Sequence, residues 1–276
     1  MLKRDTLIIA PGLASRYYWM DLWRFRELFV VLAWRDLSVR YKQTVVGLGW
    51  AIARPLLSLI VLSTIFGRLA RMPTEGTAPY ALLVFAGLLP WQLISGAISE
   101  ASSSLIGSAN LISKVYFPRM IVPVASIVVA LVDFGIGLGL LFGLMAYYRF
   151  LPGWQIVLLP CFVLMAVLAC IGPSLLLAAL NVKYRDFRYA VPFLVQMGLY
   201  ASPVGFSSAV VPDRWRLLFS LNPVVGVLDG FRWSLLGGAT PFYVPGFLAS
   251  WGVIIGMLWL GIRQFRKMES SFADLV

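Results

Sequence analysis

The chain has 276 residues, of which 60% are hydrophobic and 13% are charged, and its mean hydropathy is +0.86. This apolar share excludes an ordinary soluble enzyme and indicates an all-α integral membrane protein with one transmembrane domain, 1–276. The formal charge of +11 comes from basic residues spread along the loops, so it does not indicate a nucleic-acid-binding protein.

The first predicted element is an amphipathic helix at residues 20–42. Apolar residues recur at helical spacing on one side, and charged residues occupy another. This pattern is typical of a helix that lies at the membrane surface with its basic side toward anionic head groups, and a solvated connector is the alternative. The apolar side holds Leu22, Phe25, Phe29 and Leu32, and the polar side holds Arg24, Glu27, Arg35 and Ser38.

Six apolar segments long enough to cross the hydrocarbon core follow. Their expected bounds are 48–66, 80–99, 120–148, 154–180, 190–209 and 244–262. Two of these spans have glycines at small-xxx-small spacing, which lets helix backbones pack closely; a ligand-binding role is the alternative. These glycines are Gly135, Gly139 and Gly143 in the third span and Gly252 and Gly256 in the sixth.

The segment between the fifth and sixth spans is also apolar, but Ser202-Pro203 and Asn222-Pro223 interrupt the region. Six spans with both termini cytoplasmic place 17 Lys and Arg residues inside and six outside. A seventh span at 217–236 would move the last three basic residues outside, against the positive-inside tendency. We therefore expect residues 210–236 to be a re-entrant outer segment, buried by protein where it enters the membrane.

No residue pattern in the chain indicates an enzyme. There is no histidine, and none of the five lysines follows a glycine, so neither a histidine-based nucleophile pair nor a Gly-Lys-Ser/Thr phosphate loop is present. Cys161 and Cys170 are too far apart on one helix to form a disulfide. We expect no metal and no cofactor in this chain.

Asp133 is the one carboxylate deep inside a predicted span. An ionised group there is costly and marks either a solute pathway or a buried partner. A protonated or Arg-paired Asp133 that holds helices together is the alternative, and proton coupling through it would indicate a secondary carrier.

Two loops expected on the inner side are rich in basic and aromatic residues. The first, 102–120, resembles a short surface helix able to push on a cytoplasmic partner, and the second, 181–189, concentrates charge. A solvated loop that only sets topology explains the second without a partner. The candidate coupling residues are Leu111, Lys114, Tyr116, Phe117, Arg119, Lys183, Arg185, Asp186, Phe187 and Arg188.

Aromatic residues make up 14% of the chain. Their rings can stack on sugar rings while their polar tips reach water, although most are expected in interface belts and helix packing. The candidate pathway residues, chosen near the proline break, the membrane edges and the buried carboxylate, are Tyr41, Trp50, Trp91, Asp133, Tyr200, Ser202, Pro203 and Phe206.

Five motifs together resemble the membrane subunit of bacterial polysaccharide-export ABC transporters, which serve O-antigen, capsule and teichoic acid chains. The motifs are RDLSVRYKQTVVGLGWAIARPLL (35–57), KVYFPRMIVPV (114–124), NVKYRDFRYAVPF (181–193), ASPVGF (201–206) and LNPVVGVLDGFRWSLLG (221–237). The resemblance extends over about residues 25–265, nearly the whole chain.

The resemblance implies a homodimer in the bacterial inner membrane, joined to two copies of a separate subunit that binds ATP and Mg²⁺. It implies that the segments 102–119 and 181–188 contact this ATPase and that the cargo is a polysaccharide on an undecaprenyl lipid. It also implies an outer gate built from 210–236, for which the candidates are Asn222, Pro223, Asp229 and Arg232. The alternatives are a drug or small-lipid exporter, a proton-coupled carrier and a membrane-embedded glycan enzyme.

Overall fold

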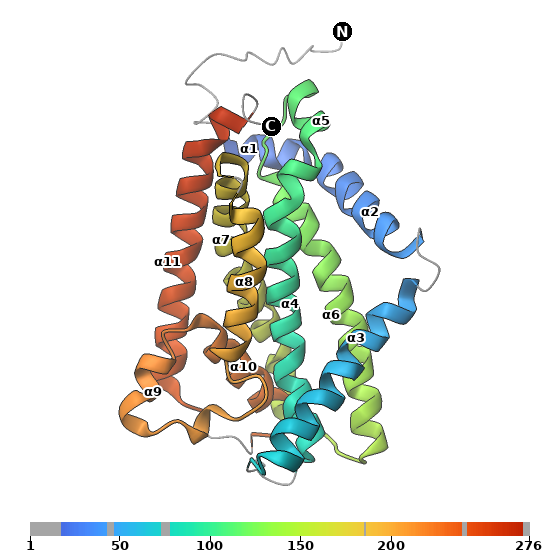
Figure 1. Ribbon diagram of the computed structural model, residues 1–276, viewed down its shortest axis with the longest axis vertical. Coiled ribbons are helices and arrows are strands. Elements are labelled where there is room, and N and C mark those ends of the chain that lie inside the picture. Colours follow the sequence, from blue (N-terminus) through green and yellow to red (C-terminus); the bar gives the residue numbers. More distant parts are fainter. Residues whose placement is uncertain (1–17, 43–46, 73–77, 185, 239–241, 273–276) are drawn as a thin grey trace.

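The computed structural model describes residues 18–42, 47–72, 78–184, 186–238 and 242–272. Helices dominate these ranges, and no strand occurs in them, which confirms the all-α prediction for the described part of the chain (Figure 1). Long helices run side by side along one axis, and short helices close the two ends of the bundle.

Five helical segments are long and apolar enough to cross a membrane. They match five of the six expected spans, and several extend beyond the expected bounds. They are α3 (Gly47–Leu62) with its π-helical continuation Ser63–Leu69, α4 (Tyr80–Gly107), α6 (Ile121–Tyr147), α7 (Leu159–Lys183) with the preceding 3-10 turn Trp154–Leu158, and α11 (Val244–Met268).

The sixth expected span, 190–209, is not one continuous helix. Helix α8 (Phe187–Tyr200) has 14 residues, or roughly 21 Å at 1.5 Å per residue, and turns follow it from Ala201. Pro203 has no backbone N–H to continue the helix, so the expected bounds are wrong at the C-terminal end. The six-span topology with both termini cytoplasmic stays a prediction.

Two predicted surface helices differ from the structure. Residues 20–42 form α1 (Tyr18–Arg24) and α2 (Arg26–Lys42), with a break at Phe25, and their apolar side packs on a core cluster at one end of the bundle. The surface helix expected within 102–120 is shorter than predicted, because α4 continues to Gly107 and only α5 (Ala109–Lys114) is separate.

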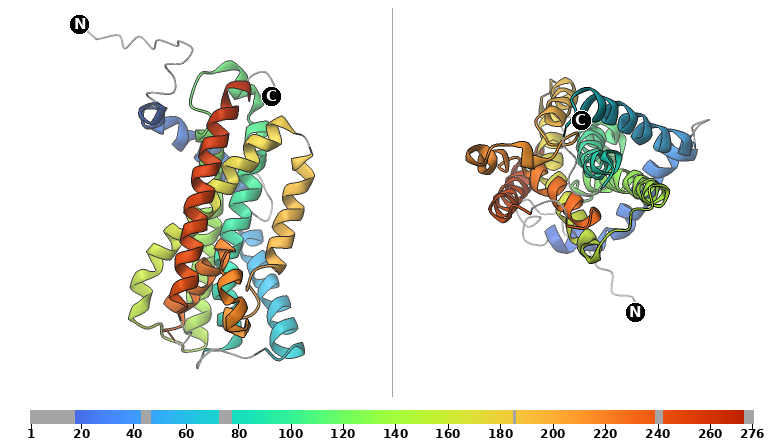
Figure 2. Two further views of the ribbon diagram at one scale, coloured as in Figure 1. Left: turned by 90° about the vertical axis from the view of Figure 1, so that its left-hand side faces the viewer. Right: turned by 90° about the horizontal axis from the view of Figure 1, so that it is seen from below.

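Helices α9 (Asp213–Phe219) and α10 (Pro223–Leu235) lie at the opposite end from α1 and α5 (Figure 1). Asn222 caps α10 by accepting a hydrogen bond from the Val224 N–H at 3.1 Å. Helix α10 packs against α4, α7 and α11, and most of its residues are buried and none is exposed, whereas α8 stands at the edge of the bundle (Figure 2). Burial of α10 is what the re-entrant interpretation requires, and the depth of 210–236 in a membrane stays a prediction.

The glycines that bring helices together are not those of the small-xxx-small pattern. A Cβ on Gly172 of α7 would lie 2.6 Å from the Met257 backbone of α11, and one on Gly261 would lie 2.2 Å from the Gly172 carbonyl oxygen. By contrast, no described atom lies within 4 Å of a Cβ built on Gly135, Gly139, Gly143, Gly252 or Gly256. The expected close packing at these five glycines is therefore absent within the described chain.

We predict that Gly172→Ala destabilises the protein, because its Cβ would force apart two helix backbones. Overpacking of this kind costs about 1–3 kcal/mol. The matched variant Gly139→Ala has open space for its Cβ and is expected to retain the wild-type thermal unfolding temperature in lipid nanodiscs. Equal unfolding temperatures for Gly172→Ala and Gly139→Ala would contradict the close α7 and α11 crossing.

Candidate functional site

A cavity of about 570 Å³ lies among α2, α3, α4, α6 and α8. One side is apolar, and the other carries charged and hydroxyl groups that could hydrogen-bond a solute. The polar lining consists of Arg40, Tyr41, Arg54, Gln92, Ser95, Ser99, Glu100 and Asp133, and the apolar lining includes Trp50, Pro55, Leu93, Phe134 and Val195.

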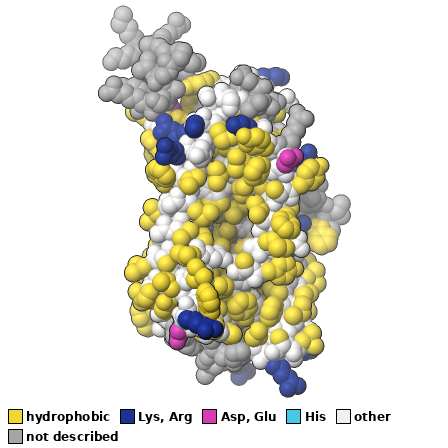
Figure 3. All heavy atoms as spheres, turned by 60° about the vertical axis from the view of Figure 1, so that its left-hand side comes forward, with side chains coloured by type: hydrophobic (Ala, Val, Ile, Leu, Met, Phe, Trp, Pro, Cys, Tyr) yellow, Lys and Arg dark blue, Asp and Glu magenta, His cyan; other side chains and the backbone are white. Residues whose placement is uncertain are grey.

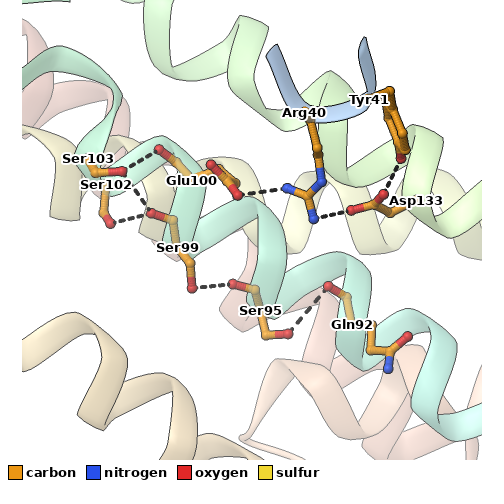
Figure 4. A network of polar contacts seen from close by, with 9 residues as sticks. All are labelled: Arg40, Tyr41, Gln92, Ser95, Ser99, Glu100, Ser102, Ser103 and Asp133. Carbon is orange, nitrogen blue, oxygen red and sulfur yellow. Dashed lines mark hydrogen bonds and ion pairs between the residues drawn. The ribbon is translucent and has the colours of Figure 1, made fainter. Parts of the chain in front are cut away.

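An ion-pair cluster forms the end of this cavity nearest α2 (Figure 4). The guanidinium of Arg40 donates to Glu100 Oε1 at 2.8 Å and lies 2.5 Å from Asp133 Oδ2. The Tyr41 hydroxyl donates to the other oxygen of Asp133, and burial together with this hydrogen bond raises the pKa of Tyr41. The cluster therefore fastens the surface helix α2 to both α4 and α6.

The serine hydroxyl groups of α4 donate hydrogen bonds to backbone carbonyls of the same helix. Ser95 donates to the Gln92 carbonyl at 3.3 Å, Ser99 to the Ser95 carbonyl at 2.8 Å, and Ser102 to the Ser99 carbonyl at 2.9 Å. A polar stripe can therefore lie in an apolar helix without an unpaired donor. The hydroxyl oxygens of Ser95 and Ser99, which line the cavity, keep acceptor capacity, because only their protons are used in these bonds.

The cavity lining places an exposed aromatic ring beside polar groups. The Trp50 side chain is 54% exposed, so its ring is available to a bound molecule. No group of three His, Cys, Asp or Glu side chains that could hold a metal occurs in the described residues. The lining combines aromatic faces, a charged cluster and hydroxyl groups, which suits a polar molecule rich in hydroxyls.

The structure divides the predicted pathway residues between two regions. Tyr41, Trp50 and Asp133 line the cavity together. Trp91 is buried, and a Cβ on Gly198 of α8 would lie 2.8 Å from its ring, so it packs α4 against α8. The others lie near or beyond the end of α8: Tyr200 is exposed, Ser202 and Pro203 are buried, and the Phe206 ring lies 6.3 Å from Phe66.

Arg232, one of the four predicted gate residues, anchors the chain segment that follows α8. Its side chain is 1% exposed and donates to three backbone carbonyls, those of Leu83 at 3.2 Å, Val204 at 2.8 Å and Phe206 at 2.8 Å. Gly87 leaves room for the guanidinium, because a Cβ there would lie 2.5 Å from Nη2. Arg232 is thus an internal support of the predicted gate segment.

Of the other three predicted gate residues, two make hydrogen bonds to the segment after α8 and one begins a helix. Asp229 accepts a hydrogen bond from the Ser208 hydroxyl at 2.6 Å. The Asn222 amide donates to the Ser202 hydroxyl at 3.0 Å and to the Ala201 carbonyl at 3.2 Å, and Pro223 begins α10. These bonds connect the beginning of α10 to the residues that follow α8.

The predicted coupling residues lie at the end of the bundle that holds α1 and α5 (Figure 1). Lys114, Tyr116, Lys183, Asp186 and Arg188 are exposed there, Leu111 and Phe187 are half-buried, and Phe117 is buried. Arg185 lies outside the described residues. The two predicted coupling loops therefore present most of their charged side chains on one end of the molecule.

Arg119, at the same end of the bundle, makes hydrogen bonds to Glu269 within the protein. Its backbone N–H donates to Glu269 Oε1 at 2.7 Å, and its side chain donates to the Glu269 carbonyl. Tyr18 donates to the same carboxylate at 3.2 Å, and burial together with the Glu269 charge raises the pKa of Tyr18. Glu269 thus joins α1, the turn after α5 and the end of α11.

Sequence reasoning missed Arg40, Glu100 and the polar side of α4 as parts of the site. Arg40 lies in the expected surface helix 20–42 but not among the four residues given for its polar side, and Glu100 directly follows the expected span 80–99. The available signal was the spacing of Gln92, Ser95 and Ser99, which repeats every three or four residues in an otherwise apolar segment.

Comparison with known proteins agrees with this architecture. The family model described as ABC-2 type transporter matches residues 27–236. The O-antigen export system permease protein RfbA of Myxococcus xanthus is 27% identical over 93% of this chain and 98% of its own length. The inner membrane transport permease YadH of Escherichia coli K12 is 27% identical over 66% of this chain and 74% of its own length.

The polysialic acid transport protein KpsM of Escherichia coli is 23% identical over 86% of this chain and 92% of its own length. The expected resemblance to export permeases and the expected multi-pass localisation in the inner membrane are confirmed. The cavity, the apolar helices and the matched segment together identify the chain as a member of the ABC-2 type transporter membrane family.

Proposed function

We propose that this chain is the transmembrane subunit of an ATP-driven exporter that moves a lipid-linked polysaccharide, carried on an undecaprenyl lipid, out of the cytoplasm. The supporting observation is the cavity among α2, α3, α4, α6 and α8, whose lining combines Trp50 and Tyr41 with hydroxyl and charged groups. Sugars are bound by such a combination of aromatic faces and polar side chains. The names of the O-antigen and polysialic acid relatives support the same class of cargo.

The energy source in this proposal is a separate subunit. The sequence has no Gly-Lys-Ser/Thr phosphate loop, so ATP and Mg²⁺ belong to a partner that docks on the exposed coupling loops. Two copies of this chain and two of the partner form the proposed exporter. ATP binding promotes transport if the partner's ATP-bound form fits one arrangement of the two membrane subunits better than another.

The contacts of Asp133 favour this function over a proton-coupled carrier. Its two oxygens contact Arg40 and Tyr41, so the carboxylate is engaged in holding α2 against α6. A proton carrier needs a carboxylate that exchanges its proton during each cycle, whereas both oxygens of Asp133 are engaged in contacts with other side chains.

The first test measures ATP hydrolysis by the chain purified with its co-encoded ATPase in nanodiscs. Lipid-linked glycan is expected to stimulate hydrolysis, and a drug-like solute is not. Trp50→Ala is expected to raise the half-stimulating glycan concentration roughly threefold to tenfold, because a lost ring contact is worth about 0.5–1.5 kcal/mol.

The control for Trp50→Ala is Trp23→Ala, which removes an exposed Trp on α1, away from the cavity. It is expected to leave the glycan dependence unchanged. Stimulation by a drug-like solute with none by any glycan would reject the proposed cargo. Equal shifts in both Trp variants would remove Trp50 from the binding site.

A second prediction concerns the ion pair between Arg40 of α2 and Asp133 of α6. Arg40→Ala and Asp133→Ala are each expected to lower thermal stability in nanodiscs, and the double variant should be less destabilised than the sum of the two. A coupling energy of about 1–3 kcal/mol is expected for a partly buried pair. The pair Arg35 and Asp36, 2.8 Å apart, lies within one helix, and Arg35 is more exposed than Arg40, so this pair should give below about 1 kcal/mol. Equal coupling in the two cycles would contradict a special role for the cavity pair.

A third prediction concerns contact with the ATPase. Asp186 is exposed in the second coupling loop, so Asp186→Arg reverses a charge without disturbing a described contact. The variant is expected to uncouple ATP hydrolysis from glycan export in proteoliposomes. Asp213→Arg makes the same change on exposed α9 at the opposite end and should leave coupling intact. Normal export by Asp186→Arg would exclude this loop from the ATPase contact.

A further inference from the structure

A basic groove separate from the cavity lies between α1 and the C-terminal part of α11. Its volume is about 520 Å³, and its lining residues are Trp19, Trp259, Ile262, Arg263, Arg266 and Lys267. No carboxylate contributes to this lining, so the groove carries three cationic side chains and no anion of its own. Its charge therefore suits an anionic ligand.

The basic side chains of the groove differ in the contacts that they make within the protein. The Arg266 guanidinium lies 4.8 Å from the centre of the Tyr18 ring and within the field of Glu269, so it holds α1 against α11. The Arg263 guanidinium lies over the Trp259 ring, 5.0 Å from its centre, a cation–π contact that leaves the N–H donors of Arg263 unused by the ring. Arg263 and Lys267 are both exposed. These two cations are the ones available to a bound phosphate.

The surface of α11 next to the groove is apolar and recessed. Leu248, Ile255 and Trp259 share one helix face with Arg263, because they are spaced by seven, four and four residues. All three are exposed, and Gly252 and Gly256 on the same side have no described atom within 4 Å of a built Cβ. The helix therefore carries a shallow apolar track that leads to the basic groove.

The surface of the molecule also separates a basic end from an apolar middle. Figure 3 shows Lys and Arg side chains gathered near the upper end of the face drawn, and hydrophobic side chains over its middle. Trp19 and Trp259 are each 59% exposed at the edge of the groove. Indole rings beside basic residues at a helix end are typical of the level of lipid head groups.

We infer that the groove between α1 and α11 is a binding site for an anionic phospholipid. Arg263 and Lys267 hold the phosphate, Trp19 and Trp259 flank the head group, and an acyl chain lies along the track of Gly252 and Gly256. The apolar track next to the basic groove can contact an acyl chain but not a free phosphate ion. The arrangement therefore favours a phospholipid over inorganic phosphate. The site is independent of the cavity among α2, α3, α4, α6 and α8.

Native mass spectrometry of the full-length protein, delipidated and then supplied with phosphatidylglycerol or phosphatidylethanolamine, tests this inference. Phosphatidylglycerol is expected to bind more tightly. The double variant Arg263→Gln/Lys267→Gln is expected to lose affinity for it roughly tenfold to thirtyfold, since each basic residue near an anionic head group contributes about a tenfold factor or less. The conservative double variant Arg263→Lys/Lys267→Arg should retain binding.

The matched control is Arg68→Gln/Arg214→Gln, which removes two exposed arginines at the opposite end, one of them also stacked on an exposed Trp. It is expected to bind phosphatidylglycerol like the wild type. Equal binding of the two lipids by the wild type, or an equal loss in both Gln double variants, would overturn the site. Complete displacement of the lipid by inorganic phosphate would reject a phospholipid site in favour of a simple anion site. The comparison of lipids on the wild type decides the question even if a variant does not fold.

Discussion

The hydrocarbon core of a membrane offers no hydrogen-bond partner, so each polar group carried into it must be satisfied inside the protein. The described structure meets this constraint in three ways. The serines of α4 donate to carbonyls of their own helix, Arg232 donates to carbonyls of other segments, and Arg40 pairs with two carboxylates. These polar residues are therefore placed where a partner is available, whereas the Ser174 hydroxyl of α7 is buried without a hydrogen bond to the described residues.

The same constraint explains why the cavity lies where it does. Gln92, Ser95 and Ser99 form a polar stripe on α4, and Arg40 and Asp133 approach it from α2 and α6. The proposed export of a hydroxyl-rich chain requires a polar surface at a depth where the rest of the bundle is apolar. Here the polar surface is attached to α4, which is the most buried of the candidate spans and so provides a fixed wall.

The helical segments were predictable because apolar length is a strong signal, and five of the six expected spans correspond to described candidate spans. The end of α8 was harder, since turns replace the helix after Tyr200 while the residues remain apolar. The site was predictable only in part. Asp133 stood out as a buried charge, whereas its partner Arg40 belonged to a helix whose orientation depends on tertiary packing. Likewise, Gly172 and Gly261 form a close crossing without the spacing that usually marks one.

Arg232 holds the chain in place directly after the end of α8. A proline after a short helix is easily taken for a flexible joint, yet the carbonyls on both sides of Gly205 are held by one planar side chain that also holds α4. The Tyr80 hydroxyl donates to the Gly205 carbonyl itself at 2.5 Å. Three successive carbonyls are thus immobilised by residues of α4 and α10. These bonds tie residues 204–206 to α4 and α10, so the chain is held where it leaves α8, whereas Pro192 is the position inside α8 that lacks a backbone N–H.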